Sequence, residues 1–568
     1  MSLGLFLSWR RRWDSNPRAL ADNLISSQAR CDHFDTSPYI HFPFPAASAA
    51  DRTYEYSIII PEKSKAALEI SAIVPDMRRK MRKTAFFLFQ RAEAYAIMAA
   101  LRKRGERCFT SMEQREKLNS RLGFILLSAG CAIGIGNVWK FPYITGQYGG
   151  GAFVLVYLFF LAVMGVPMMA LEFSIGRASR KSPLLACRVL EKPGQKWHLQ
   201  GYMAMAGNYL LMMFYTTVSG WMLHYFYLTA TGAFAGAQVE EVEAIFAGML
   251  ARPGVMVFWM ALVVAAGFSI CSLGIQKGVE RMTKVMMLSL LALIVVLAVN
   301  SLRLEGGLEG LKFYLVPDFR RMADIGVGTV VVAAMNQAFF TLSLGIGAMA
   351  IFGSYIGKER SLLGESVRVA MLDTFVAIVS GLIIFPACFA FGVDADSGPN
   401  LIFITLPNIF NHMAGGRLWG SLFFIFMAFA AFSTVIAVFE NIISCCMDLT
   451  GCSRKKAAMV NIALMILLSL PCALGFNLLS GVTPFGPGSN IMDLEDFLVS
   501  NLILPLGSLI YLLFCVSSGG WGWENFTREA NTGRGLKVRD GMRLYMTFVL
   551  PVLIAVIFLL GIWDKFFA

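Results

Sequence analysis

The chain has 568 residues, of which 57% are hydrophobic and 15% are charged, and its formal net charge is +12. Soluble globular domains hold about 45–50% apolar and about 25% charged residues. The composition therefore excludes a single soluble domain and predicts a polytopic membrane protein. The net charge does not indicate nucleic-acid binding, because residues 1–111 alone hold 18 Lys and Arg against 11 Asp and Glu.

Residues 1–111 form a basic extension without any apolar stretch near the roughly 20 residues that a membrane span requires. Two interpretations stay open. The segment is either upstream sequence included by an over-extended gene boundary, with Met112 as the natural start, or a disordered cytoplasmic arm held near anionic lipid.

Residues 112–568 contain eleven apolar segments, which predict eleven membrane spans. These are 121–147, 151–175, 201–231, 254–274, 282–302, 325–356, 362–391, 418–449, 457–479, 497–516 and 544–563. Lys and Arg gather in every second connection, beginning with the one after the second span. The positive-inside bias places the N-terminus in the cytoplasm and, with an odd number of spans, the C-terminus outside the inner membrane.

Within the first span, the run 128–142 contains three glycines together with Asn137 and Lys140. Backbone is irregular at membrane depth only where it lines a cavity within the protein. We therefore expect a broken helix here, with a binding site for an ion or a polar solute. The sixth span carries a similar break at 337–347, five spans later. Because five is odd, the two breaks fall in halves of opposite orientation, as an inverted repeat requires.

Three motifs carry a resemblance to a known family: GNVWKFPY at 136–143, YGGGAF at 148–153 and FFTLSLGIGA at 339–348. From Met112 onward, the chain resembles the neurotransmitter:sodium symporters with the fold of the bacterial leucine transporter. The resemblance implies an all-α integral membrane protein with eleven transmembrane helices and broken helices 1 and 6. Two inverted five-helix repeats would occupy 112–302 and 303–517, followed by an extra helix in 518–568.

The resemblance also implies two sodium sites and no organic cofactor. The first would use the Ala132 carbonyl, the side chains of Asn137, Thr341 and Asp373, and the substrate carboxylate. The second would use the carbonyls of Gly130, Ile133 and Ala430 and the hydroxyls of Ser433 and Thr434. Alternatively, these two hydroxyls only hydrogen-bond to their own helix, as hydroxyls in spans commonly do.

The substrate carboxylate is expected, again by resemblance, at the N–H groups of Ile135 and Gly136 and the hydroxyl of Tyr215. Gly134 leaves room for that carboxylate, where monoamine-carrying relatives have an Asp. The side-chain pocket would be lined by Leu211, Phe340, Ser343, Ile346, Thr434 and Val438. These residues predict a neutral, hydrophobic amino acid, although each apolar one taken alone is also typical of ordinary core.

Asp373 departs from chloride-dependent relatives, which have Asn at this position. A charged side chain at mid-membrane costs about 2.5–3.5 kcal/mol and needs a compensating cation or proton. We expect Asp373 to supply the negative charge that chloride supplies elsewhere. Tyr157 and Gln337 match the family's chloride positions, but Ala377 replaces its usual hydroxyl.

Two charge pairs match the family's gates. Lys140 and Asp496 would close the outer side, and Arg115 and Asp448, with Tyr355 beside them, would close the inner side. The alternative is that these charges are only solvated at the membrane edges. Glu440 follows Ser433 by two helical turns and is either a stop on an inner ion path or a paired, buried carboxyl.

The sequence thus predicts a symporter that imports a neutral amino acid on a sodium gradient across the inner membrane. Its partners would be this small molecule and the lipid bilayer, without nucleic acid. The alternative is a membrane sensor of the same fold that binds an amino acid without moving it. An enzyme is not expected, because no HExxH, GxSxG or Cys-His cluster appears.

Overall fold

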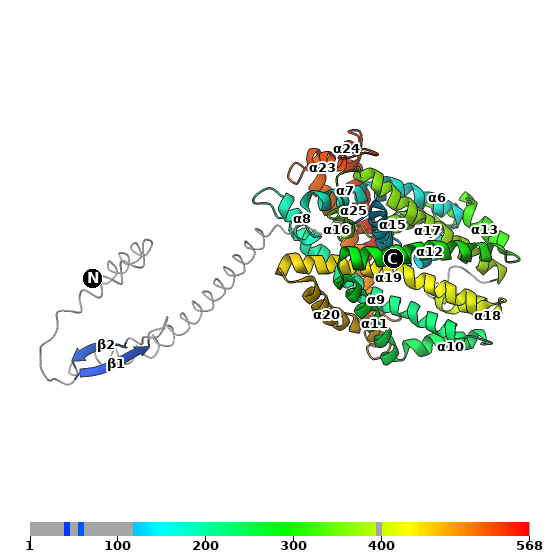
Figure 1. The fold of residues 1–568 in the computed structure, drawn as a ribbon, viewed down its shortest axis with the longest axis horizontal. Coiled ribbons are helices and arrows are strands. Elements are labelled where there is room, and N and C mark those ends of the chain that lie inside the picture. The colour runs from blue at the N-terminus through cyan, green and yellow to red at the C-terminus, as the bar shows by residue number, and fades with distance from the viewer. Residues whose placement is uncertain (1–38, 46–54, 62–117, 393–399, 567–568) are drawn as a thin grey trace. The chain divides into compact units, whose positions relative to one another are not determined.

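The computed structural model describes residues 39–45, 55–61, 118–392 and 400–566 (Figure 1). The chain divides into two compact units, 1–112 and 113–568, which are described separately. In the first unit, β1 (Tyr39–Pro45) and β2 (Glu55–Pro61) pair antiparallel, with Phe42 opposite Ile58. The remainder of the 1–111 extension lies outside the described residues, and so does Arg115. Both interpretations of the extension stay predictions.

The described part of the second unit is helical, which confirms the predicted all-α class. Its longer helices are α4 (Arg121–Ala132), α6 (Gly151–Phe160), α7 (Val166–Ser179), α9 (Leu199–Thr231), α10 (Val239–Leu250), α11 (Pro253–Ser272), α12 (Arg281–Leu302), α15 (Val327–Phe340), α17 (Leu362–Ala390), α19 (Gly416–Thr450), α20 (Arg454–Leu474), α22 (Leu504–Val516) and α25 (Leu550–Phe566).

Short helices connect or extend these elements. They are α5 (Phe141–Gln147), α8 (Pro183–Leu190), α13 (Gly307–Leu315), α14 (Phe319–Ile325), α16 (Ala348–Gly353), α18 (Leu406–His412), α21 (Ile491–Phe497), α23 (Trp523–Ala530) and α24 (Met542–Leu544). Single π-helical turns are η2 (Gly136–Lys140), η3 (Leu161–Gly165), η4 (Ile275–Glu280), η5 (Leu401–Thr405), η6 (Leu498–Ile503) and η7 (Tyr545–Val549).

Within the described residues, eight helices are long and apolar enough to cross a membrane. The number rises to at most ten when two bent helix pairs are each counted as one span. The multi-pass prediction is therefore confirmed, whereas the count of eleven spans stays a prediction.

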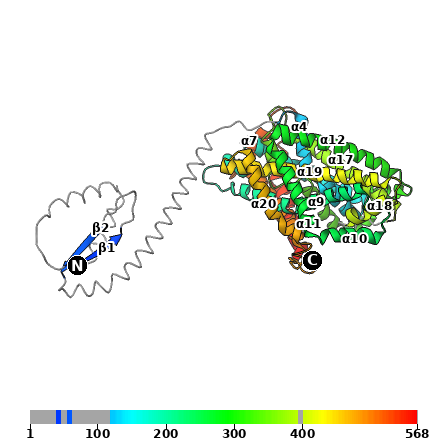
Figure 2. The ribbon, with the colours of Figure 1, turned by 60° about the horizontal axis from the view of Figure 1, so that its bottom comes forward.

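Helix α19 lies at the centre of the bundle, where it packs against α4, α9, α11 and α12 (Figures 1 and 2). Within its most apolar stretch 78% of the residues are buried inside the protein, against 28% for the span 542–563 at the C-terminus. Helix α17 packs against α4, α7, α12 and α13. Helices α17 and α19 thus both pack against α4, although they are far from it in the sequence.

The break in the first span is where the sequence predicts it. Helix α4 ends at Ala132, η2 begins at Gly136, and the two halves are bent by 57°. Ile133 is extended, with φ −71° and ψ 98°, so the i to i−4 ladder stops there. The carbonyls and N–H groups released by this stop face the interior of the bundle rather than lipid.

The break in the sixth span is also confirmed, because α15 ends at Phe340 and α16 starts only at Ala348. The backbone between them turns through the left-handed region at Ser343 (φ 50°), Gly345 (φ 100°) and Gly347 (φ 72°). Glycine adopts such φ values without steric cost, which explains the two glycines. Both breaks lie against α19 or its neighbours, so two irregular backbone segments meet inside the bundle.

Candidate substrate and ion site

The first cluster of polar side chains joins the two breaks to α17. Asn137 Nδ2 donates to Asp373 Oδ1 at 2.8 Å, and the Thr341 hydroxyl donates to Asp373 Oδ2 at 3.1 Å. All three side chains are buried. Three of the four residues expected at the first sodium site are therefore in direct contact. The fourth, Ala132, ends α4 one turn before Asn137.

Asp373 receives hydrogen bonds only from neutral groups, and no described Lys or Arg forms an ion pair with it. A buried carboxylate without a cation is strongly unfavourable, since its attraction to neutral donors does not replace its lost hydration. Carboxylate, hydroxyl and amide oxygens are ligands for hard cations. The cluster fits a sodium ion if the Asn137 amide turns its Oδ1, which now accepts from Gly134 N at 3.2 Å, toward Asp373.

A second cluster lies between α4 and α19. The Ser433 hydroxyl donates to the Ala430 carbonyl at 2.9 Å and approaches the Ile133 carbonyl at 3.5 Å. The Thr434 hydroxyl reaches the carbonyls of Gly130 at 3.3 Å and Ile133 at 3.4 Å. The five residues expected at the second sodium site are thus together. The Ser433 hydroxyl bonds to its own helix, as the alternative interpretation of these hydroxyls expects, whereas the Thr434 hydroxyl bonds to a carbonyl of α4.

The Tyr215 hydroxyl of α9 accepts from Ile135 N at 3.1 Å, beside the first break. A Cβ added to Gly134 would lie 2.4 Å from Tyr215 Oη and 2.9 Å from Thr434 Oγ1. One added to Gly136 would lie 3.0 Å from the Phe340 ring. Side chains at these two positions would therefore crowd the residues packed around the first break.

The side chains expected to line the substrate pocket are buried or half-buried around this point. Leu211, Ile346, Thr434 and Val438 are buried, and Phe340 and Ser343 are half-buried. Ile346 packs against the position of Gly207 on α9, one turn before Leu211. Its carbonyl accepts from Asn208 Nδ2 at 2.9 Å. The second break is in this way fixed against α9.

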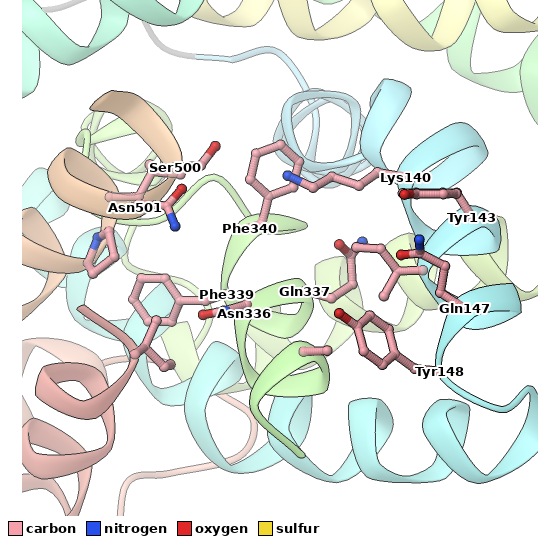
Figure 3. A pocket seen from close by; sticks show the side chains of 15 residues that line it. Lys140, Tyr143, Gln147, Tyr148, Asn336, Gln337, Phe339, Phe340, Ser500 and Asn501 are labelled. Atoms are coloured by element: carbon pink, nitrogen blue, oxygen red, sulfur yellow. The ribbon is translucent and has the colours of Figure 1, made fainter. Parts of the chain in front are cut away.

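A cavity of about 270 Å³ opens on the other side of Phe340. Side chains of α5, α15 and the η6–α22 segment surround it (Figure 3), and Ile557 of α25 completes its wall. Lys140 Nζ lies 3.9 Å from the centre of the Phe340 ring, a cation–π contact (Figure 3). The Phe340 ring thus contacts both Lys140 in the cavity wall and Gly136 at the first break.

The outer gate pair is apart in this conformation. Lys140 lies on Phe340, and Asp496 accepts from the Ser500 hydroxyl at 2.6 Å. The opposite end of the bundle is held by ion pairs. Arg121, at the start of α4, binds the buried Glu365 at 2.9 Å, and Arg368 binds the same carboxylate at 2.8 Å.

The predicted inner gate is only partly described, because Arg115 lies outside the described residues. Asp448 accepts from Ser182 N at 2.8 Å. The Tyr355 hydroxyl donates to Glu440 Oε1 at 2.7 Å, and Arg454 binds Glu440 Oε2 at 2.6 Å. Of the two interpretations of Glu440, this geometry matches the paired, buried carboxyl.

Comparison with known proteins decides the family. The model of the sodium:neurotransmitter symporter family matches residues 115–244 and 238–565. The chain belongs to this family. It is 35% identical over 395 residues to the sodium-dependent transporter YhdH of Bacillus subtilis, covering 70% of this chain and 86% of that one.

Two further relatives support this family assignment. A sodium-dependent transporter of Haemophilus influenzae is 30% identical over 463 residues, which cover 79% of this chain and 99% of the relative. The crystal structure of MhsT in complex with L-phenylalanine superimposes with a TM-score of 0.71 at 40% identity, covering 79% of this chain and all of that chain. The chain is thus a sodium-dependent transporter with the leucine-transporter fold and not an enzyme, as the sequence predicts.

Glu172 of α7 is not among the site residues that the sequence predicts. Its side chain is fully buried, and it accepts from Gly345 N at 2.5 Å and Met349 N at 3.2 Å. It thereby holds N–H groups that the second break leaves without a helical partner. A single acidic residue within the apolar segment 151–175 was the signal that could have found it.

Proposed function

We propose that the chain is a symporter that uses sodium to import a neutral, hydrophobic amino acid across the cytoplasmic membrane by alternating access. The observation that carries this proposal is the position of Asp373. This buried carboxylate contacts Asn137 and Thr341, next to the backbone N–H groups that the first break exposes. A bound cation would compensate the charge of Asp373, and the carboxylate of a bound solute would accept hydrogen bonds from these N–H groups.

The first sodium ion would bind Asp373, Thr341, Asn137 and the Ala132 carbonyl. The second would bind the carbonyls of Gly130, Ile133 and Ala430 and the hydroxyls of Ser433 and Thr434. Two sodium ions with a zwitterion would move two net charges. This is worth roughly 4.6 kcal/mol per 100 mV, enough for accumulation on the order of 10³-fold.

The substrate carboxylate would bind Ile135 N, Gly136 N and the Tyr215 hydroxyl, close to the first sodium ion. Its side chain would lie among Leu211, Phe340, Ser343, Ile346, Thr434 and Val438. This wall has no charged member, so an ionised side chain would be buried without a partner. The 40% identity to MhsT, solved with L-phenylalanine, supports an amino acid of this kind.

Transport would not need chloride. Ala377, which is buried, stands where the family's usual hydroxyl would complete a chloride site with Tyr157 and Gln337. The negative charge for sodium binding would instead come from Asp373, which belongs to the chain and needs no second solute.

If the chain follows the positive-inside bias, the 270 Å³ cavity would lie on the outer face and the Arg121–Glu365 pair in the cytoplasmic half. The structure then corresponds to a conformation held shut on the inside. Import would proceed in two moves. Lys140 would leave Phe340 to pair with Asp496, and afterwards the ion pairs at the start of α4 would separate.

The proposal is tested by uptake of labelled amino acids into proteoliposomes that hold the full chain, with an inward sodium gradient and a matched choline control. We expect accumulation of phenylalanine or another neutral amino acid in sodium alone. Substitution of chloride by gluconate should leave it unchanged. Sodium-dependent binding without accumulation or exchange would instead identify a sensor.

A further inference from the structure

Glu495 of α21 is an unusual acidic residue in this bundle. It is 3% exposed, and neither oxygen of its carboxyl group has a hydrogen-bond partner among the described residues. The described residues include five other buried acidic side chains, each bound by donors or cations: Glu172, Glu280, Glu365, Asp373 and Glu440. Glu495 alone among them has neither, so its burial requires another explanation.

Its surroundings come from two other helices. Helix α21 packs against α9 and α20, and Ile491 meets Gly475 just beyond the end of α20. One turn deeper, the Cys472 thiol of α20 approaches the Glu495 carboxyl and also Thr217 of α9. The thiol falls short of a hydrogen bond to either oxygen. A thiol is only a weak donor, so it does little to stabilise an ionised carboxylate.

No cation compensates Glu495 from the elements packed against it. On α9, Tyr215 is bound to Ile135 N and the ring of His224 packs against that of Trp259. The cations of α20 are at its other end, at 454–456, and η6 carries no titratable side chain. The remaining charged groups near α21 are engaged elsewhere. Asp493 accepts from Asn490 N, Asp496 accepts from the Ser500 hydroxyl, and Lys565 lies over Phe485, whose ring contacts Phe497.

An ionised carboxylate buried without cation or donor costs several kcal/mol, whereas a protonated carboxyl avoids that cost. Glu495 is also next to Asp496, whose proposed partner Lys140 is now on Phe340. We propose that Glu495 is a proton-binding site coupled to closure of the outer gate. It holds a proton while Lys140 and Asp496 are apart. It releases this proton to water as α21 moves to bring them together.

The reason for release is electrostatic. Closure would bring the Lys140 ammonium to the turn of α21 that contains Glu495, and an opposite charge within about 4–6 Å favours the ionised form of a carboxyl. Proton binding at Glu495 would therefore favour the open outer conformation and proton release the closed one. This coupling rests on the proposed function, but the protonation of Glu495 does not.

The first test needs no transport. Thermal unfolding of the purified full chain is followed from about pH 5 to about pH 9 for wild type, Glu495→Gln and Glu243→Gln, the last an exposed control on α10. A proton held in the folded state stabilises less as the pH rises. We expect the wild-type midpoint to fall relative to Glu495→Gln by roughly 2–4 °C over this range, with Glu243→Gln following wild type. Parallel curves for wild type and Glu495→Gln would overturn the proposal.

The second test measures proton release with a pH-sensitive dye when sodium and L-phenylalanine are added to the purified full chain in weakly buffered solution. Release on binding is the readout, because a site that takes its proton up again when the outer gate reopens gives no net release over many cycles. We expect proton release per amino acid bound in wild type and Glu243→Gln, and its loss in Glu495→Gln. If Glu495→Gln does not fold, Glu495→Met replaces it, because a neutral, apolar side chain of similar length suits this site. Release that persists in the folded variant would overturn the coupling. Absence of phenylalanine binding in every protein would instead refute the proposed function and leave the unfolding curves to decide protonation.

Discussion

Asn137 Nδ2 donates to Asp373 Oδ1 at 2.8 Å, although 236 residues separate them in the sequence. This contact joins the first broken span to α17 and places a carboxylate beside the unwound backbone. The Thr341 hydroxyl joins the second break to the same carboxylate. Both breaks therefore share one negative charge, and any change in that charge is expected to affect both halves of the transporter.

Asp373→Asn tests the charge directly. The substitution keeps the shape and removes the charge, and hydrogen bonds or contacts to charged groups are worth about 1.5–3 kcal/mol. We expect the sodium concentration for half-maximal uptake to rise by roughly 10-fold or more. Uptake that remains should become dependent on chloride. Asp318→Asn, an exposed change outside the spans, is the control. Unchanged sodium affinity in Asp373→Asn, with chloride without effect, would contradict this role.

Gly134→Ala tests the space at the first break. The added Cβ would lie 2.4 Å from Tyr215 Oη, so the tyrosine has to move and its contact with Ile135 N is lost. We expect phenylalanine uptake to fall by more than 10-fold, chiefly through weaker substrate binding. Gly248→Ala on α10 is matched, because nothing lies within 4 Å of its added Cβ. Equal uptake in both variants would show that the position tolerates a side chain.

The two breaks could be predicted from the sequence because glycine and polar residues such as Asn137 and Lys140 destabilise an apolar helix. This effect depends only on the residues of the helix itself, so it can be recognised without knowing the fold. Bringing 130–137 together with 341, 373 and 430–434 needed the family resemblance, since no local rule relates positions so far apart. The separation of Lys140 and Asp496 could not be predicted at all. Conformations of a transporter differ by only a few kcal/mol, and sequence patterns do not resolve such differences.

Glu172→Gln tests what holds the second break. The carboxylate accepts from two N–H groups with two different oxygens, whereas an amide has one acceptor oxygen. One buried N–H would lose its partner, at a cost of about 1–3 kcal/mol. We expect a lower midpoint of thermal unfolding and weaker binding of phenylalanine. Glu240→Gln, exposed on α10, is the control. A midpoint equal to that of wild type would mean that water replaces the carboxylate.

Arg454→Met tests the paired state of Glu440. The pair is largely buried, with Glu440 at 0% and Arg454 at 14% side-chain exposure. Removing one partner of such a pair leaves an uncompensated charge and costs about 3–5 kcal/mol, whereas replacing both partners is often close to neutral. We therefore expect Arg454→Met to lower the midpoint of unfolding strongly, and Glu440→Gln combined with Arg454→Met to recover most of that loss. Additive losses in the double variant would show instead that each side chain acts through separate contacts, such as those of Glu440 with Tyr355 and Ser444.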